Sequence, residues 1–471
     1  MQQSQQTYDD ETLRKAIADC TNTFMPQEKQ VDLGDKKPWF VTNVNGTRTF
    51  LHRILAQELL KKFSIVRYPT PHSDLYYFNS KKGIYEQDKS GRQIKGIIRS
   101  MDDLKQNHVR EVYSYLEDTS PIVNEISSKY VAVENGLINL NTFELEPFSP
   151  AAFLIQKVPT AYNENAHDSF IDSTLTKVTK GHVPSIQNIK EMFACVLYPQ
   201  MLVPKMFYLY GRSAHNGKSS LLNMIHETFN KNGGNISAVS PQKLATNTFA
   251  AASMYGKFAN IVDDLPDLTI EDSGTLKSII TWGNIEIERK GKDSETVKMY
   301  TPLITASNHF PNFKENGAQI NRRLFIIPFE HNFSTDTDCI SDIESMRRIA
   351  SVQAREYVLK LAVETLADML KNPDEDILTP NEKARRAGES FAEQSDPLLD
   401  YFCEFDVNYF EESQGTGVLE DYDAWCSKNR VQGLTTKRFK EVVCSHYNME
   451  WKQKRVNING VSKSVKGFAK K

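Results

Sequence analysis

The amino-acid sequence predicts an α/β core that follows an α+β segment and precedes a small domain of helices and a hairpin. Strand-like apolar runs alternate with helical patterns between positions 200 and 330, and short strands mix with helices before position 180. Three helical patterns precede a hairpin pattern near the C-terminal end. A chain of 471 residues is too long for one core. We therefore expect domains at 1–180, 181–371 and 395–471, with a polar linker at 372–394.

Composition restricts the class of protein. Hydrophobic residues make up 39% and charged residues 25%, as in ordinary globular proteins, and no run of eighteen apolar residues could span a bilayer. The net charge of −3 means that any nucleic-acid contact must come from local basic patches. Six scattered cysteines lack C-x-x-C spacing, which argues against a zinc site or a disulfide framework. The first residues lack a secretory signal, so we expect a cytoplasmic protein without a membrane partner.

The first motif is a glycine-punctuated turn between an apolar strand at 207–210 and a helix start. A P-loop needs this order, because backbone N–H groups point at phosphates, Lys218 reaches the β/γ-phosphates and Ser219 holds Mg²⁺. Gly211 lies one residue further from Gly217 than the usual spacing. Gly-Lys-Ser alone is more often a surface turn, but apolar residues on both sides favour a nucleotide site. The expected phosphate-binding residues are Gly211, His215, Asn216, Gly217, Lys218, Ser219 and Ser220.

Three further polar groups adjoin buried strands. Asp263 and Asp264 follow a strand at 258–262; paired acids there are usually a turn, but the 45 positions after Lys218 leave room for a helix before the next parallel strand. One carboxylate can then hold Mg²⁺ while the other polarises water. Asn308 ends the strand at 302–307 and can orient water against the γ-phosphate. Arg322 and Arg323 precede a strand ending at 329; they are ordinarily surface charges, but in this order either can be an arginine finger.

Two basic segments are candidates for DNA contact. Residues 285–300 alternate apolar and charged side chains around a glycine, which predicts a β-hairpin carrying Arg289, Lys290 and Lys292. A solvated hairpin is the plain alternative. Residues 434–471 hold ten Lys or Arg against two Glu, so this end is basic although the chain is not. Its helix, helix, helix and hairpin pattern predicts a winged helix whose expected DNA-binding residues are Lys437, Arg438, Lys452, Lys454 and Arg455.

The P-loop, the acidic pair, the basic hairpin, Asn308 and the two arginines follow one another within about 115 residues. This set of motifs resembles that of superfamily 3 helicases, whose P-loop ATPase is AAA+-like. Residues 135–150 and 159–166 are similar to the N-terminal signature of the phage, plasmid and poxvirus members. The resemblance covers about residues 65–470 and is closest to replication helicases of staphylococcal pathogenicity islands and related mobile elements.

The resemblance implies an ATP-dependent replicative DNA helicase of a mobile element. It implies a hexameric ring with ATP and Mg²⁺ between subunits, Ser219 and Asp263 on the metal, Asp264 activating water, and Asn308 as sensor. Arg323 is the first choice of finger and Arg322 the second. Lys290 and Lys292 would contact single-stranded DNA in the pore, the winged helix would contact duplex origin DNA, and a separate primase or polymerase would supply priming. A packaging or remodelling ATPase, and an origin-binding initiator without unwinding activity, remain as alternatives.

Overall fold

The computed structural model describes residues 37–68, 74–265, 270, 273–289, 294–311, 313, 320–371, 377–394, 397–429, 433–458 and 461–471. The chain forms two compact units. The smaller comprises the described residues up to Phe63 together with Ser90–Ser120, and the larger comprises Ser64–Lys89 and the described residues from Pro121 onward. None of the helices in these ranges combines the length and apolar character that a membrane crossing requires.

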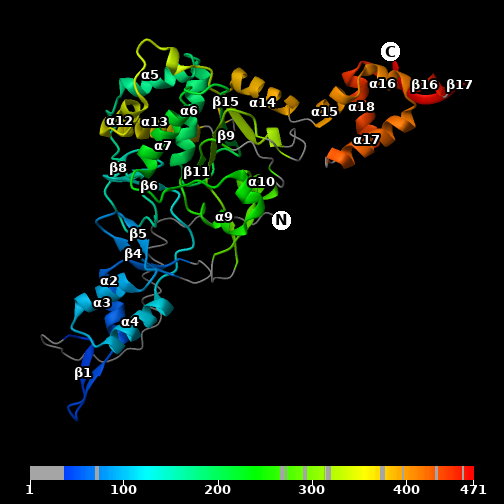
Figure 1. The fold of residues 1–471 in the computed structure, drawn as a ribbon. Helices are drawn as coiled ribbons and strands as arrows, with labels where there is room; N and C mark the ends of the chain where they lie inside the picture. The colour runs from blue at the N-terminus through cyan, green and yellow to red at the C-terminus, as the bar shows by residue number, and fades with distance from the viewer. Residues whose placement is uncertain are drawn as a thin grey trace. The chain divides into compact units, whose positions relative to one another are not determined.

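The described residues of the smaller unit form a short hairpin and the helices α2, α3 and α4 (Figure 1). Its core forms because α2 and α4 carry apolar residues three or four positions apart, such as Leu55 and Leu59 on α2 and Val112 and Leu116 on α4, all fully buried. The elements are β1 (Phe40–Thr42), β2 (Arg48–Phe50), α2 (His52–Lys62), α3 (Arg92–Met101) and α4 (Gln106–Thr119).

The larger unit begins with two small antiparallel sheets. One contains β3 (Ile65–Arg67), β4 (Leu75–Asn79) and β5 (Ile84–Gln87), and the other contains β6 (Tyr130–Val133), β7 (Gly136–Asn139) and β8 (Leu145–Glu146). Val131 and Ile138, from the second sheet, belong to the same hydrophobic core as the helices and strands that follow. The second of these sheets is therefore packed directly against the α/β core.

A five-stranded parallel sheet forms the centre of the larger unit. Its order is β10 (Ile236–Ser237), β11 (Ala259–Val262), β14 (Leu303–Ser307), β9 (Met206–Tyr210) and β15 (Leu324–Pro328). β9 lies between β14 and β15, which explains why its first four residues are buried. β14, which Asn308 follows, lies between β9 and β11. The P-loop follows β9 and Asp263 follows β11, so these two strands are not direct neighbours.

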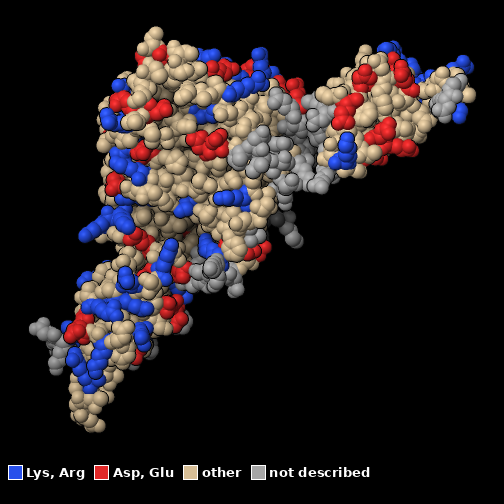
Figure 2. Space-filling view, in the orientation of Figure 1, with Lys and Arg blue, Asp and Glu red and all other residues tan. Residues whose placement is uncertain are grey.

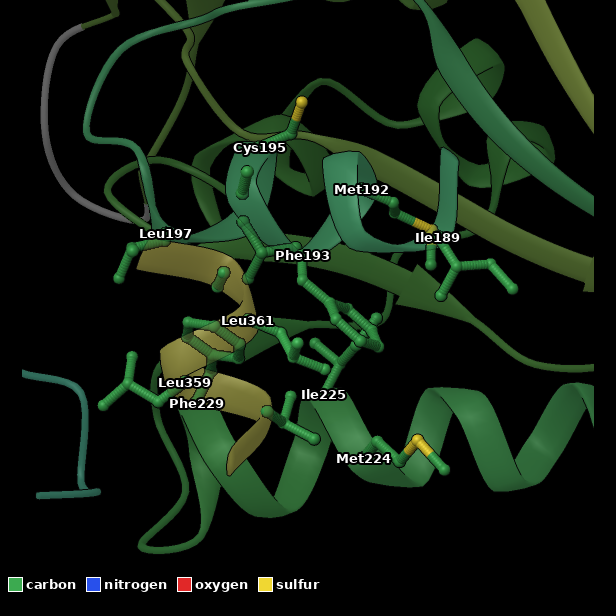
Figure 3. Close-up of a cluster of buried hydrophobic side chains, with 14 of the residues drawn as sticks. Ile189, Met192, Phe193, Cys195, Leu197, Met224, Ile225, Phe229, Leu359 and Leu361 are labelled. Atoms are coloured by element: carbon green, nitrogen blue, oxygen red, sulfur yellow. The ribbon is translucent and has the colours of Figure 1, made fainter. Parts of the chain in front are cut away.

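Helices cover both faces of this sheet. Alternate β9 side chains point to opposite faces: Phe207 and Leu209 enter one hydrophobic core, and Met206 and Tyr208 enter another. Figure 3 shows the first core, where side chains of α6, α7 and α13 meet. Its helices are α5 (Ser169–Val178), α6 (Val183–Leu197), α7 (Lys218–Asn230), α12 (Asp342–Ile349) and α13 (Val352–Lys371). The second core includes α8 (Pro241–Thr246), α9 (Thr248–Ala252), α10 (Gly274–Ile280), α14 (Glu382–Gln394) and the hairpin of β12 (Asn284–Ile287) and β13 (Glu295–Lys298).

The C-terminal residues form helices followed by a long hairpin with a core of their own. The elements are α15 (Pro397–Glu404), α16 (Val407–Glu412), α17 (Gly415–Asn429), α18 (Thr436–His446), β16 (Met449–Ile458) and β17 (Val461–Lys470). Thr435 caps α18 by accepting a hydrogen bond from the backbone N–H of Arg438. β16 and β17 pair in register from Met449↔Lys470 to Ile458↔Val461, so the expected hairpin is present. Tyr401, Phe439 and Phe468 fill the core.

Candidate active site

The carboxyl ends of three parallel strands bring the predicted P-loop, acids and amide to one edge of the sheet. Gly211 follows β9, Asn308 follows β14 and Asp263 follows β11. Because these strands are successive neighbours, groups that are 97 positions apart in the chain, from 211 to 308, meet at that edge. Parallel α/β sheets bind ligands at this edge.

The P-loop folds closely on itself, which explains the unusual glycine spacing. A β-carbon on Gly211 would lie 2.2 Å from Nδ2 of Asn216 and 2.7 Å from the backbone oxygen of Phe329. Gly217 has a φ of +89° and begins α7 as its N-cap. The offset glycine is therefore required by the approach of the Asn216 side chain, which donates to the backbone oxygen of Ser213 at 2.7 Å.

Lys218 is the first residue of α7, and its ammonium is held by three oxygen atoms. Nζ donates to the backbone oxygen of Gly211 at 3.1 Å, to Oδ1 of Asn216 at 3.0 Å and to Oδ1 of Asn308 at 2.7 Å. Burial lowers the pKa of Lys218, while the nearby carboxylates of Asp263 and Asp264 oppose that shift. The ammonium thus lies between the P-loop and β14, facing two acids.

The site has the donors and acceptors that a nucleotide phosphate and Mg²⁺ require. In the part of the chain that the structure describes, the backbone N–H groups of residues 214–217 donate to no acceptor, and they precede the N-terminus of a 13-residue helix. Ser219, Asp263 and Asp264 are exposed beside them. Mg²⁺ is usually held by one or two protein carboxylates together with phosphate oxygens, and a hydroxyl and two carboxylates are present here. The residues present fit both groups.

A backbone turn after β11 keeps the side chains of Asp263 and Asp264 exposed. Asp264 has a φ of +56°, a left-handed conformation that Asp adopts more readily than most residues. The next N–H, from Leu265, donates to the backbone oxygen of Ala306 at 3.1 Å and ties the turn to β14. Both carboxylates consequently stay exposed where β11 leaves the sheet.

Arg322 and Arg323 lie at the opposite end of the sheet from the P-loop. The N–H of Met206, the first residue of β9, donates to the backbone oxygen of Arg323 at 2.8 Å, and Leu324 pairs with Met206. The five residues of β9 separate this end from Gly211, a distance of about 16 Å at 3.3 Å per residue. Neither arginine belongs to the site of its own chain.

The β12–β13 hairpin is formed where the alternating pattern predicts it. Ile285 and Val297 pair across it and are buried. Arg289 is half-buried at the loop end of the two strands, 3.7 Å from the carboxylate of Glu295, with its guanidinium 5.8 Å from the ring centre of Tyr255. Lys290 and Lys292 lie outside the described residues.

The predicted basic residues of the C-terminal domain have two different environments. Lys437, Arg438, Lys452 and Arg455 are exposed, with Arg438 3.0 Å from the carboxylate of Glu441. Lys454 instead turns inward: Nζ donates to the backbone oxygens of residues 410 and 411 at 2.8 and 2.6 Å, and burial lowers its pKa. Figure 2 shows Lys and Arg toward the β16–β17 end of this domain and acidic residues over its helices.

Sequence reasoning missed a second basic surface, on the smaller unit. In this unit residues 37–63 carry five Lys or Arg against one Glu, whereas residues 90–120 carry five Lys or Arg and five Asp or Glu. Figure 2 shows blue residues gathered on its visible face. Counting charge over residues 37–63 alone would have found this basic segment.

Residues 209–323, which contain all the groups described at the sheet edge, match a family described as a family of unknown function (DUF5906). The chain is also similar to a protein named "Putative helicase 184R" of invertebrate iridescent virus 6, with 21% identity over 369 residues. The aligned part is 68% of this chain and 37% of that protein, so this chain spans little more than a third of that relative's length.

Two solved structures share the fold. Both are apo structures of the C-terminal region of NrS-1, with TM-scores of 0.53 and 0.51 and identities of 12% and 13%. In both comparisons the aligned region covers 88% of this chain and 98% of the solved chain. The likeness therefore extends well beyond the α/β core.

Proposed function

We propose that this chain is an ATP-driven DNA helicase that acts in the replication of a mobile genetic element. The observation that carries the proposal is the meeting of Lys218, Asp263 and Asn308 at one edge of a parallel sheet, beside N–H groups that have no acceptor among the described residues. The helicase name of the viral relative supports the DNA-unwinding part. The finer resemblance to replication helicases of staphylococcal islands belongs to this proposal as well.

Each residue of the site has a role in ATP hydrolysis. The N–H groups of residues 214–217 and the ammonium of Lys218 hold the β/γ-phosphates. Ser219 and Asp263 hold Mg²⁺, which when bound neutralises charge on the phosphate oxygens. Asp264 takes a proton from the attacking water, and Asn308 orients that water against the γ-phosphate.

The placement of the arginines favours an ATP site shared between subunits. Arg322 and Arg323 are too far from Gly211 to act within one chain, yet a neighbouring subunit can present the opposite end of its sheet to this P-loop. An arginine supplied in this way stabilises the charge of the transition state. We therefore propose a closed ring, a hexamer by the resemblance, with Arg323 as finger and Arg322 as alternative.

DNA contacts are proposed at two places. The hairpin, with Arg289, Lys290 and Lys292, contacts single-stranded DNA in the ring's pore. The C-terminal domain acts as a winged helix and binds duplex origin DNA through its exposed basic residues. A separate primase or polymerase then extends the unwound strands.

The test is strand displacement from a forked DNA with the wild-type chain and the Lys218→Ala variant. Wild type should hydrolyse ATP and release the strand, and the variant should do neither while its circular-dichroism spectrum stays unchanged. ATP hydrolysis stimulated by DNA without strand release would identify a packaging or remodelling ATPase. Origin binding that needs no ATP, in the absence of any strand release by wild type, would identify an initiator without unwinding activity.

A further inference from the structure

Two exposed aromatic side chains lie at the open end of the β12–β13 hairpin, away from its loop. Trp282 precedes β12 and Tyr300 follows β13, and they are 40% and 42% exposed. Their ring centres are 6.0 Å apart in an edge-to-face arrangement. Because both rings remain so exposed, packing in the hydrophobic core does not account for them, and paired aromatic groups on a surface are typical of interaction sites.

The backbone of Trp282 is in an unfavourable conformation. Its φ is +63°, in the left-handed region, and it directly follows the C-cap of α10, Thr281, where glycine is the usual residue. A bulky side chain in this conformation costs about 1–3 kcal/mol. Since glycine would remove that cost, the presence of tryptophan indicates a use for the ring.

Tyr300 also lines a cavity of about 380 Å³, which lies within the usual size range of small-ligand sites. Four more tyrosines line it, and exposed amide side chains stand at its wall. These residues are Tyr68, Tyr130, Tyr198, Tyr255, Asn124 and Gln200. Aromatic faces and amide edges together suit a flat ring that carries hydrogen-bonding groups.

The charges around the cavity favour a neutral ligand inside and an anion outside. The lining contains two lysines, Lys257 and Lys298, and two glutamates, Glu125 and Glu295, and Glu295 is also paired with Arg289. The wall is therefore close to electrically balanced. Lys298, however, is exposed on β13 next to the aromatic pair, where it can contact a phosphate.

We propose that an unpaired base of single-stranded DNA stacks on the Trp282–Tyr300 pair and enters the tyrosine-lined cavity, with its phosphate on Lys298. The inference rests on the proposed helicase function, because it assigns a base-binding site next to the proposed pore hairpin. Only an unpaired base exposes its full face, so this site favours the single strand over duplex. Every base has such a face, so the site tolerates any sequence.

The test compares two probes of equal length and charge, an oligo(dT) strand and a strand of abasic sites, by fluorescence anisotropy with the full-length chain. Wild type should bind oligo(dT) more tightly than the abasic strand. Trp282→Ala should weaken oligo(dT) binding about 5- to 150-fold and leave abasic binding unchanged. The slope of log affinity against log salt should not change in Trp282→Ala, whereas Lys298→Ala should reduce it by about one.

Ring-retaining variants provide the matched controls. Trp282→Phe and Tyr300→Phe keep an aromatic face and should retain most of the oligo(dT) preference, and wild type should show more fluorescence quenching by oligo(dT) than Trp282→Phe. Equal binding of both probes by wild type would overturn the base site while leaving a phosphate-binding helicase intact. Equal loss of both probes in Trp282→Ala would assign the ring a structural role and overturn the proposal. A wild-type chain that binds neither probe would overturn the proposed function itself.

Discussion

Lys218 donates a hydrogen bond from Nζ to Oδ1 of Asn308 at 2.7 Å, which joins the P-loop helix to the end of the neighbouring strand β14. Without nucleotide the amide is an acceptor for the ammonium. Under the proposed function, a γ-phosphate would offer the ammonium a stronger, charged acceptor and would free the amide for the water and the phosphate. The same contact would then make Asn308 responsive to the presence of the γ-phosphate.

Asn308→Ala should separate ATP binding from hydrolysis. Lys218 keeps the oxygens of Gly211 and Asn216, so the fold and ATP affinity should persist, while the loss of a polar group at the reacting phosphate should lower kcat about 100-fold or more. Asn308→Asp should behave differently, because its carboxylate pairs with Lys218 and repels the γ-phosphate, so ATP affinity should fall as well. Titration calorimetry measures ATP affinity, and steady-state kinetics measure kcat. Normal turnover in Asn308→Ala would remove the sensor role.

Gly211→Ala should damage the P-loop although the substitution is small. The new β-carbon would lie 2.7 Å from the backbone oxygen of Phe329, which cannot move without shifting the chain after β15. We expect a loss of about 1–3 kcal/mol in the free energy of unfolding and much weaker ATP binding. Gly96→Ala is the control, because Gly96 lies within α3 with open space around it and should be neutral or stabilising. Wild-type ATP affinity in Gly211→Ala would contradict this account of the glycine spacing.

The sequence could predict the parts of the site that depend on order along the chain. A buried strand ending in Asp263, or one ending in Asn308, is visible as an apolar run followed by a polar group. Strand order is not visible in this way, since β14 inserts between β9 and β11 through contacts far apart in sequence. That insertion is what brings Asn308 to Lys218. The sequence also could not predict that the ammonium of Lys454 contacts backbone oxygens. A lysine on a hairpin has the same sequence pattern whether its ammonium faces solvent or the protein.

Mixed rings should recover ATPase activity if the site is shared between subunits. Arg323 lies at the amino end of β15, away from the P-loop of its own chain, so Arg323→Ala and Lys218→Ala damage opposite halves of one interface. Each variant alone should be inactive. Mixing them should restore part of the activity, because some interfaces then contain an intact arginine and an intact P-loop. No recovery at any ratio, with mixed assembly verified by mass spectrometry, would argue against a finger from Arg323.

Glu191→Ala should destabilise the larger unit through a buried polar network. Glu191 is 2% exposed and accepts hydrogen bonds from the backbone N–H and hydroxyl of Thr379 at 3.0 and 2.5 Å and from the amide of Asn188 at 2.8 Å. Its removal leaves the N–H and hydroxyl of the half-buried Thr379 without this acceptor, and the Nδ2 group of Asn188 keeps only the backbone oxygen of Thr379, at a cost of about 1–3 kcal/mol in urea unfolding. Glu364→Ala is the control, since that carboxylate is 57% exposed and lies 3.7 Å from Lys360, an arrangement worth about 0–1 kcal/mol. Equal stabilities of the two variants would show that the network contributes little.

Lys454 and Arg455 are neighbours on β16 and should contribute to different properties of the C-terminal domain. The Arg455 side chain is exposed, so Arg455→Ala should lower the slope of log affinity against log salt for duplex DNA by about one. Lys454 donates to the backbone oxygens of Phe410 and Glu411, so Lys454→Ala should leave that slope unchanged and lower the free energy of unfolding by about 1 kcal/mol instead. Since both substitutions remove one positive charge, a general effect of net charge predicts equal slopes, and only direct phosphate contact predicts different ones. A reduced slope in Lys454→Ala would mean that its ammonium leaves the two carbonyl groups and turns to the phosphates when DNA binds.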